Sequence, residues 1–350
     1  MLEHLETRLE SDWSAIRRAK ETTLAQRGLL NSAFKTKVAH DTSVVLFGSI
    51  ARKEVTSGSD ADWILLIDGQ AAPEHENQRR DVEDILEREN FGRPGKSGVF
   101  GCMVASHSLV HDIGGEDDTN SNTTRRILLL LESLAVGDDA AAYTRVRRQI
   151  LNRYLHDDNG LRYGKGPFRV PRFLLNDVTR YWRTITVDFV YKQRSDAGAK
   201  WALRNAKLRL SRKLVFTSGL LRCFFCHLDP EAEEARKDLD KNNDPTKLAA
   251  YMEAQLALTP LQLLARAASR PAISNSTARL LFESYDGFLA LLDAKEDREE
   301  LARLVPHDLD KSQVWAKVRK FGRDFQTGLT QLFFGQDEEL TKLMIEYGIF

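Results

Sequence analysis

The sequence predicts an α/β (α+β) protein in which a small mixed sheet with an N-terminal helix is followed by a helical domain. Two short apolar runs bounded by turn residues predict buried strands, and nearly everything after Arg125 has helical periodicity. With 350 residues the chain exceeds the roughly 250–300 residues at which single hydrophobic cores stop growing. We therefore expect two domains, residues 1–122 and 123–350.

The elements of the first domain follow from periodicity. Leucines and other apolar residues recur at helical spacing over 1–36, while 43–47 and 63–67 are apolar runs too short for helices. The charged run 74–90 predicts a surface helix, and the glycine-rich residues 91–98 predict a loop. Two further strands are expected at 99–105 and 108–113.

Composition limits the classes of function. The 51 basic residues are cancelled by 51 acidic ones, which argues against a dedicated nucleic-acid binder. The first residues lack the apolar core of a secretory signal, and no run approaches 18 apolar residues. Three cysteines suit a reducing compartment better than a disulfide framework. We expect a cytoplasmic protein with no membrane partner.

A glycine turn and two acidic residues carry the chemistry. The first predicted strand leads into Gly48 and Ser49, where backbone N–H groups and a hydroxyl can approach a phosphate. Asp60 and Asp62 begin the second strand two positions apart, so strand periodicity places both carboxylates on one face. Such a pair suits Mg²⁺ bridging protein and substrate phosphates.

This stretch, residues 44–67, resembles the signature of the polymerase-beta-like nucleotidyltransferase superfamily. That signature is a hydrophobic residue, Gly, then Gly or Ser, a short spacer, and Asp-hydrophobic-Asp/Glu-hydrophobic. Ala61 departs from it slightly, being only weakly hydrophobic. Arg52 matches a basic residue often found after the turn in small bacterial members. The resemblance implies metal-dependent transfer of a nucleotidyl group, with Gly48, Ser49 and Arg52 binding the nucleotide.

The resemblance also implies a third carboxylate on a later strand. Asp112 has the best strand-like context and is the expected third metal ligand, with a turn residue or an ion-pair partner of Arg125 or Arg126 as the alternative. The string HDIGGEDDTNSNTTRRILLLLES (111–133) is similar to the segment that follows the catalytic strands in protein-PII uridylyltransferases.

A basic stripe lies on an apolar helix face farther along the chain. At 100° per residue, Lys200, Arg204, Lys207 and Ser211 fall within about 60° of one another, whereas Arg212 projects away. Inward cations are costly unless an anion meets them. Related superfamily members place a lysine, often with a serine, against the nucleotide phosphates, so Lys207 and Ser211 are expected to bind the triphosphate. The alternative is internal pairing, for instance to Asp177 or Asp188.

Together these features predict an enzyme with an NTP as substrate and Mg²⁺ or Mn²⁺ as cofactor. By resemblance to the uridylyltransferases, a protein hydroxyl is the leading acceptor. An RNA end, a small molecule or another nucleotide is the alternative acceptor. A regulatory or antitoxin-like protein that uses the fold to bind a partner is the alternative from another class.

Overall fold

The computed structural model describes residues 1–35, 41–89, 91, 98–195 and 200–349. Within them, four strands form a mixed sheet in the order β3-β2-β1-β4. The strands are β1 (Thr42–Phe47), β2 (Asp62–Ile67), β3 (Cys102–Ala105) and β4 (Ser133–Val136). β1 pairs antiparallel with β2 and β4, whereas β3 runs parallel to β2. The predicted fold class, a small mixed sheet with a helical remainder, is confirmed.

Both faces of the sheet are covered, which explains why its strands are apolar runs rather than alternating patterns. Val44 and Leu46 pack with the smaller core cluster under α2 and α4, and Val45 and Phe47 pack with the larger cluster on the other side. The helices around the sheet are α2 (Ser14–Ala33), α4 (Glu74–Arg88), α5 (Ser106–Val110), α6 (Asn120–Leu131) and α7 (Ala141–His156).

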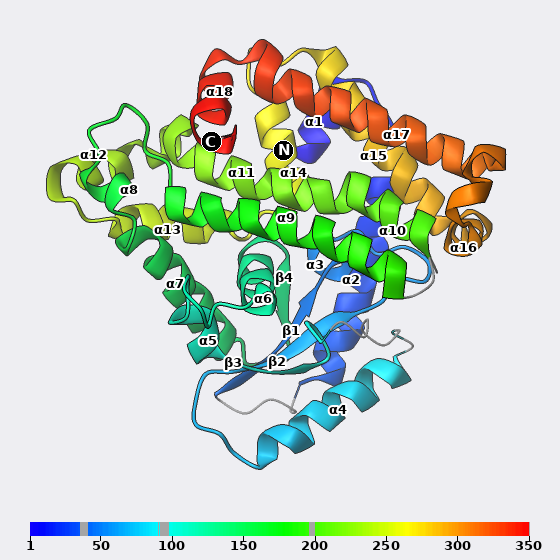
Figure 1. Cartoon of the computed structure of the whole chain (residues 1–350), viewed down its shortest axis with the longest axis horizontal. Helices are drawn as coiled ribbons and strands as arrows, with labels where there is room; N and C mark the ends of the chain where they lie inside the picture. Colours follow the sequence, from blue (N-terminus) through cyan, green and yellow to red (C-terminus); the bar gives the residue numbers. More distant parts are fainter. Residues whose placement is uncertain (36–40, 90, 92–97, 196–199, 350) are drawn as a thin grey trace.

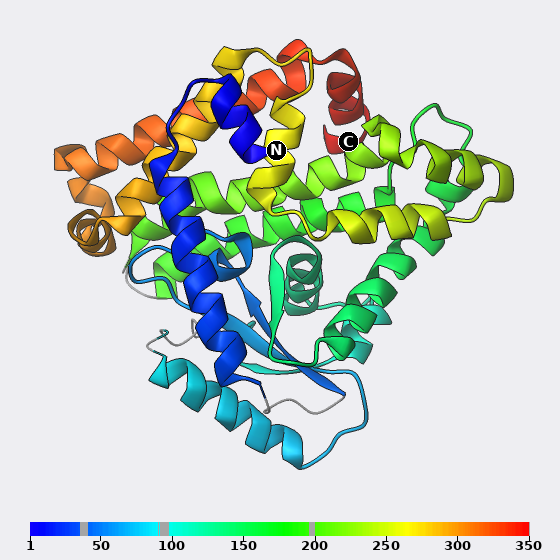
Figure 2. The same ribbon diagram turned by 180° about the vertical axis from the view of Figure 1, so that it is seen from behind.

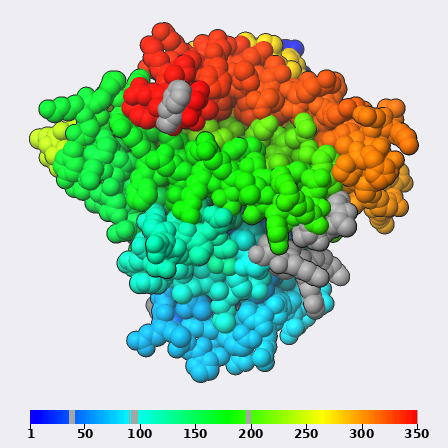
Figure 3. All heavy atoms as spheres, in the orientation of Figure 1, coloured from blue at the N-terminus to red at the C-terminus, as the bar shows by residue number. Residues whose placement is uncertain are grey.

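The helical part is broad and lies across one end of the sheet, while the sheet part tapers away from it (Figures 1 and 3). The N-terminal helix α1 (Leu2–Arg8) packs on α14, and α2 packs on α15. The longer helices are α9 (Arg172–Ser195), α11 (Lys213–Leu228), α15 (Asn275–Asp293) and α17 (Gln313–Gln331). Shorter helices are α8 (Asn159–Tyr163), α10 (Trp201–Lys207), α12 (Glu233–Asn242), α13 (Thr246–Gln255), α14 (Pro260–Ala268), α16 (Lys295–Arg303) and α18 (Glu338–Leu343). None of the helices among the described residues combines the length and apolar character needed to span a bilayer.

The α-helices α10 and α11 are joined by a π-helical segment, η1 (Leu208–Arg212), so the three form one continuous rod. A π turn takes more residues than an α turn and therefore shifts the phase of the helix face. Further short π- and 3-10 segments are η2 (Pro230–Ala232), η3 (Pro306–Lys311), η4 (Leu332–Gln336) and η5 (Met344–Ile349).

Several predicted elements are confirmed, and others are wrong. β1, β2 and α4 lie where expected, while the single helix over 1–36 is broken between α1 and α2. The strand expected at 99–105 is shorter, and most of the loop expected at 91–98 lies outside the described residues. The strand expected at 108–113 is wrong, because helix α5 follows β3 directly. β4 was not predicted, and it supplies the sheet with a strand from beyond residue 122.

Candidate functional site

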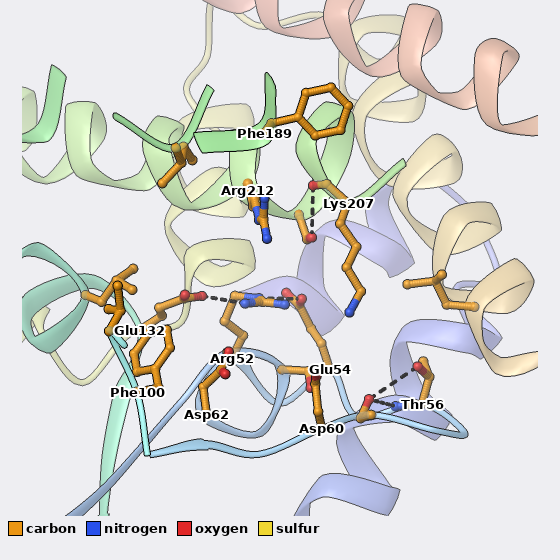
Figure 4. Close-up of a pocket in the computed structure, with 18 of the residues that line it drawn as sticks. Arg52, Glu54, Thr56, Asp60, Asp62, Phe100, Glu132, Phe189, Lys207 and Arg212 are labelled. Carbon is orange, nitrogen blue, oxygen red and sulfur yellow. Dashed lines mark hydrogen bonds and ion pairs between the residues drawn. The ribbon is translucent and has the colours of Figure 1, made fainter. Parts of the chain in front are cut away.

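One cavity, of about 200 Å³, lies between the sheet and the helical part. Every residue predicted to bind the nucleotide or the metal lines it, with the exception of Asp112. These residues are Gly48, Ser49, Arg52, Asp60, Asp62, Lys207 and Ser211. Two strand ends from the N-terminal region and a helix about 150 residues later therefore contribute to the same space (Figure 4).

The turn after β1 brings backbone close to the acidic pair. Gly48 has a φ of 76°, a conformation that L side chains rarely adopt, and Ser49 begins the short helix α3 (Ser49–Arg52). A Cβ atom on Gly48 would lie 3.9 Å from Asp62 Oδ2. This turn can therefore present N–H groups and the Ser49 hydroxyl to a phosphate beside the carboxylates.

Asp60 and Asp62 both point into the cavity (Figure 4). Asp62 begins β2 opposite Phe47, while Asp60, expected on the same strand, lies just before it and is more exposed. Neither carboxylate forms a hydrogen bond or ion pair to another side chain in the described part of the chain. Two acidic groups are thus left open toward the cavity.

The two carboxylates differ in their electrostatics. Burial, followed by the neighbouring Asp60 charge, raises the pKa of Asp62 to about 7. Burial would also raise the pKa of Asp60, but the positive fields of Lys207 and Arg298 outweigh it and hold that pKa below its ordinary value. A bound cation would remove the repulsion within the pair, which makes the site receptive to positive charge.

Lys207 faces the pair from the helical part (Figure 4). Its ammonium forms no ion pair with any residue the structure describes, and burial lowers its pKa. The Ser211 hydroxyl donates to the Lys207 carbonyl over 3.1 Å. The prediction that Arg212 projects away is wrong: the π turn of η1 rotates it into the cavity lining.

Arg52 lies in the cavity wall between two acidic residues (Figure 4). Its Nε donates to Glu54 Oε2 over 2.7 Å, and its Nη1 pairs with Glu132. Tyr285, from α15, donates to the same Glu54 oxygen over 2.8 Å. Arg52 is therefore occupied within the protein, and its direct effect is to hold Glu132 and Glu54 in place.

Asp112 does not reach the cavity. It was expected on a strand, but α5 ends at Val110 and Asp112 lies in the following loop, outside the lining. Glu132 instead lies at the cavity wall between the end of α6 and β4. Its negative charge contributes to the raised pKa of Asp62, which places it near the acidic pair.

Further lining residues escaped the sequence reading. Arg298 of α16 lies in the lining and donates to the Gly58 carbonyl, next to the loop that carries Asp60. The aromatic rings of Phe100 and Phe189 line the same cavity (Figure 4). Local periodicity does not reveal a π turn or a contact between residues more than 200 positions apart. The sequence therefore gives little indication of these lining residues.

The donor set can be tested against a divalent ion. No group of three or more His, Cys, Asp or Glu side chains among the described residues is arranged to hold a metal. Mg²⁺ usually takes only one or two protein carboxylates and completes its shell with water and substrate phosphates. The open pair Asp60 and Asp62, beside a phosphate-binding turn, fits that mode of binding.

Comparison with known proteins agrees with this geometry. The family model described as "Nucleotidyltransferase domain" matches residues 29–93, which contain β1, the Gly48–Ser49 turn and the Asp60–Asp62 pair. No curated protein and no solved structure matches the chain. The chain thus contains a stretch similar to a nucleotidyltransferase domain, and this similarity supports nucleotidyl transfer as its general chemistry.

Proposed function

We propose that the protein is a Mg²⁺- or Mn²⁺-dependent nucleotidyltransferase that moves a nucleotidyl group from an NTP to an acceptor hydroxyl. The observation that carries this proposal is the pair of open carboxylates, Asp60 and Asp62, beside the Gly48–Ser49 turn and opposite Lys207 in one cavity. In the reaction the acceptor oxygen bonds to the α-phosphorus, the bond from that phosphorus to the bridging oxygen breaks, and pyrophosphate leaves. The proton of the acceptor hydroxyl passes to a carboxylate of the cavity.

Each group has a role in this proposal. When bound on Asp60 and Asp62, the metal ion would polarise the phosphates and neutralise charge on the leaving group. The turn donates N–H and hydroxyl groups to the phosphates, and Lys207, Ser211 and Arg212 meet them from the other side. Catalysis is then mainly positioning and electrostatic stabilisation.

We propose that Glu132, rather than Asp112, is the third carboxylate beside Asp60 and Asp62. Glu132 lines the cavity near Asp62, and its pairing with Arg52 fixes its direction. Arg52, proposed from the sequence as a nucleotide contact, acts in this arrangement through Glu132 and Glu54. The aromatic rings of Phe100 and Phe189 offer apolar surface for a base in the same cavity.

For the acceptor we propose a hydroxyl on a protein. The balanced charge of the chain supports this choice over RNA, because an RNA end would need a basic track beyond the triphosphate site. The similarity of 111–133 to uridylyltransferases points the same way, although these residues lie outside the matched range 29–93. We also propose that the helical part closes the cleft, with the division between the two parts beyond β4 rather than at the expected residue 122, which lies within α6.

The test is incubation with each of the four α-³²P-labelled NTPs, Mg²⁺ or Mn²⁺, and cell lysate. The double variant Asp60→Asn, Asp62→Asn is the negative control, and Asp112→Asn is the matched control from outside the cavity. Label on a protein band that depends on Asp60 and Asp62 would support the proposal. Label on RNA or in a soluble product would replace the acceptor, and equal background in wild type and double variant would contradict the enzymatic activity.

A further inference from the structure

A second cavity, of about 260 Å³, lies on the far side of the α3 turn from the candidate site. It is walled by α2, the residues around α3, the start of β4, α7 and the connection between α13 and α14. Seen from behind in Figure 2, α2 (blue), β4 and the yellow α13–α14 connection border this region. Ala51 and Lys53 line it, whereas Gly48 and Ser49 line the first cavity. The two cavities thus share the turn as a partition.

Three cations from separate elements line this cavity: Arg27 of α2, Lys53 after α3, and Arg147 of α7. In the part of the chain that the structure describes, none of the three forms an ion pair. The acidic residue of the lining, Glu132, has its carboxylate engaged by Arg52 in the wall of the first cavity. The second cavity therefore carries an excess of positive charge.

The arginines are held in place by backbone and ring contacts. Arg27 donates from Nε to the Ile50 carbonyl over 2.9 Å and from Nη2 to the Ala51 carbonyl over 2.8 Å. Arg147 lies over the Tyr143 ring at 4.7 Å, and its Nε is buried without a hydrogen-bond partner among the described residues. An orphaned buried donor beside unpaired cations costs free energy unless an anion meets it.

A further cation, Arg222, contacts the α13–α14 connection that lines the second cavity. Arg222, fully buried, donates to the carbonyls of Gln255 and Leu258, in the same connection that lines the cavity. Burial and the nearby Arg147 charge lower the pKa of Arg222 to about 9. Burial, Arg27 and Lys20 likewise lower the pKa of Lys53. The cations repel one another, so a bound anion would relieve an existing repulsion.

We propose that this second cavity binds a phosphate group of a small anion, separately from the candidate nucleotide site. Guanidinium groups bind phosphate through charge-assisted and often bidentate hydrogen bonds, and two of the three cations here are arginines. Arg27 already donates hydrogen bonds to the carbonyls of Ile50 and Ala51 in α3. An anion bound to Arg27 would therefore act on the turn that presents Ser49. This binding does not depend on nucleotidyl transfer and can be measured without it.

The test is isothermal titration of the full chain with inorganic pyrophosphate, and separately with inorganic phosphate. Chelator is present throughout and ionic strength is held constant with chloride, so that no divalent ion supports binding in the first cavity. We expect saturable binding of at least one of the two probes. Lys53→Gln, whose side chain makes no hydrogen bond to a described residue, and Arg147→Gln should each weaken it at least about tenfold.

Two controls locate the bound anion. Arg148→Gln removes the next residue of α7, an exposed arginine paired with Glu253, and should leave the affinity unchanged. Lys207→Gln removes a cation from the lining of the first cavity and should also leave the affinity of the second cavity unchanged. Absence of binding by wild type to either probe, loss of binding in Lys207→Gln with retention in Lys53→Gln, or equal weakening in Arg148→Gln would each overturn the proposal.

Discussion

Two clusters of charged residues join the sheet part and the helical part, and they differ in how their charges are paired. The buried Arg126 of α6 bonds to Asp118, Asp177 and the hydroxyl of Tyr154, at distances between 2.6 and 3.1 Å. In the candidate site, Asp60 and Asp62 face Lys207 without an ion pair. One set is complete within the protein, whereas the other is left open.

The difference separates a structural role from a binding role. A buried charge that has all its partners fixes how two elements pack, and breaking it leaves uncompensated charge. A half-buried charge without partners destabilises the free protein, and it is retained where a ligand supplies the missing partner. Substitutions in the paired network should therefore affect stability, and substitutions in the open cluster should affect activity.

The largest effect is expected from removing one of the open carboxylates. Asp62→Asn should lower nucleotidyl transfer by about 10³–10⁴-fold, roughly 4–5.5 kcal/mol of transition-state stabilisation, because the metal loses a charged ligand. Initial rates with labelled NTP at saturating Mg²⁺ measure this. Asp112→Asn should retain activity within about threefold, a negligible change by the same arithmetic. Equal losses in both variants would mean that the cavity does not define the site.

The paired network should respond in stability instead. Arg126→Met leaves Asp118 and Asp177 with Arg180 as their remaining cationic partner, at 2.7 and 3.9 Å, and should cost up to about 3–5 kcal/mol in the free energy of unfolding. Urea denaturation followed by circular dichroism gives the value. Arg148→Met, which breaks an exposed pair with Glu253, should cost less than about 1 kcal/mol. If both substitutions cost the same, the buried network does not hold the two parts together.

Prediction from the sequence was most successful for the site residues that lie close together along the chain. Gly48, Ser49, Asp60 and Asp62 lie within fifteen residues, and the expected strand spacing put both carboxylates on one side. In the structure Asp62 begins β2 and Asp60 lies just before it, and both line the cavity. Lys207 and Ser211 could be found because cations on an apolar helix face require an explanation. Each of these predictions used one element at a time.

The failures arise where several elements act together. The strand expected at 108–113 is replaced by the end of the five-residue helix α5 and the residues after it, and short apolar runs do not distinguish strand from helix. β4 has four residues directly after the leucine-rich end of α6, and only pairing with β1 makes it a strand. Glu132 and Arg298 reach the cavity through tertiary packing, and Arg212 reaches it through a π turn. No local sequence pattern predicts these positions.

Lys207 offers a sharper test of the open cluster. Lys207→Gln removes a cation that has no partner in the described protein, so stability should stay within about 1 kcal/mol of wild type or rise slightly. The KM for NTP should increase about 10–100-fold, since a charge-assisted contact to phosphate is worth roughly 1.5–3 kcal/mol. Steady-state kinetics and thermal denaturation of the same preparation decide it. A loss of stability with unchanged KM would mean that Lys207 has a structural role, like Arg126, rather than a role in binding NTP.

The smallest expected effect distinguishes the two kinds of carboxylate by the sign of their pH dependence. Because the pKa of Asp62 is raised from its ordinary 3.8 to about 7, ionising it destabilises the free protein as pH rises through that interval. With chelator present, Asp62→Asn should therefore exceed wild type in unfolding free energy by about 1–3 kcal/mol at pH 8 and by almost nothing at pH 4.

Asp118, whose pKa is lowered because Arg126 and Arg180 outweigh the effect of burial, should behave oppositely. Its contribution is present at neutral pH and is lost as pH falls, so Asp118→Asn should be destabilising at pH 7 and less so in acid. Urea titrations of both variants from pH 2 to 8 measure the two slopes, since the contribution of Asp118 is lost only below its ordinary pKa of 3.8. Slopes of the same sign would remove the distinction between the open and the paired cluster.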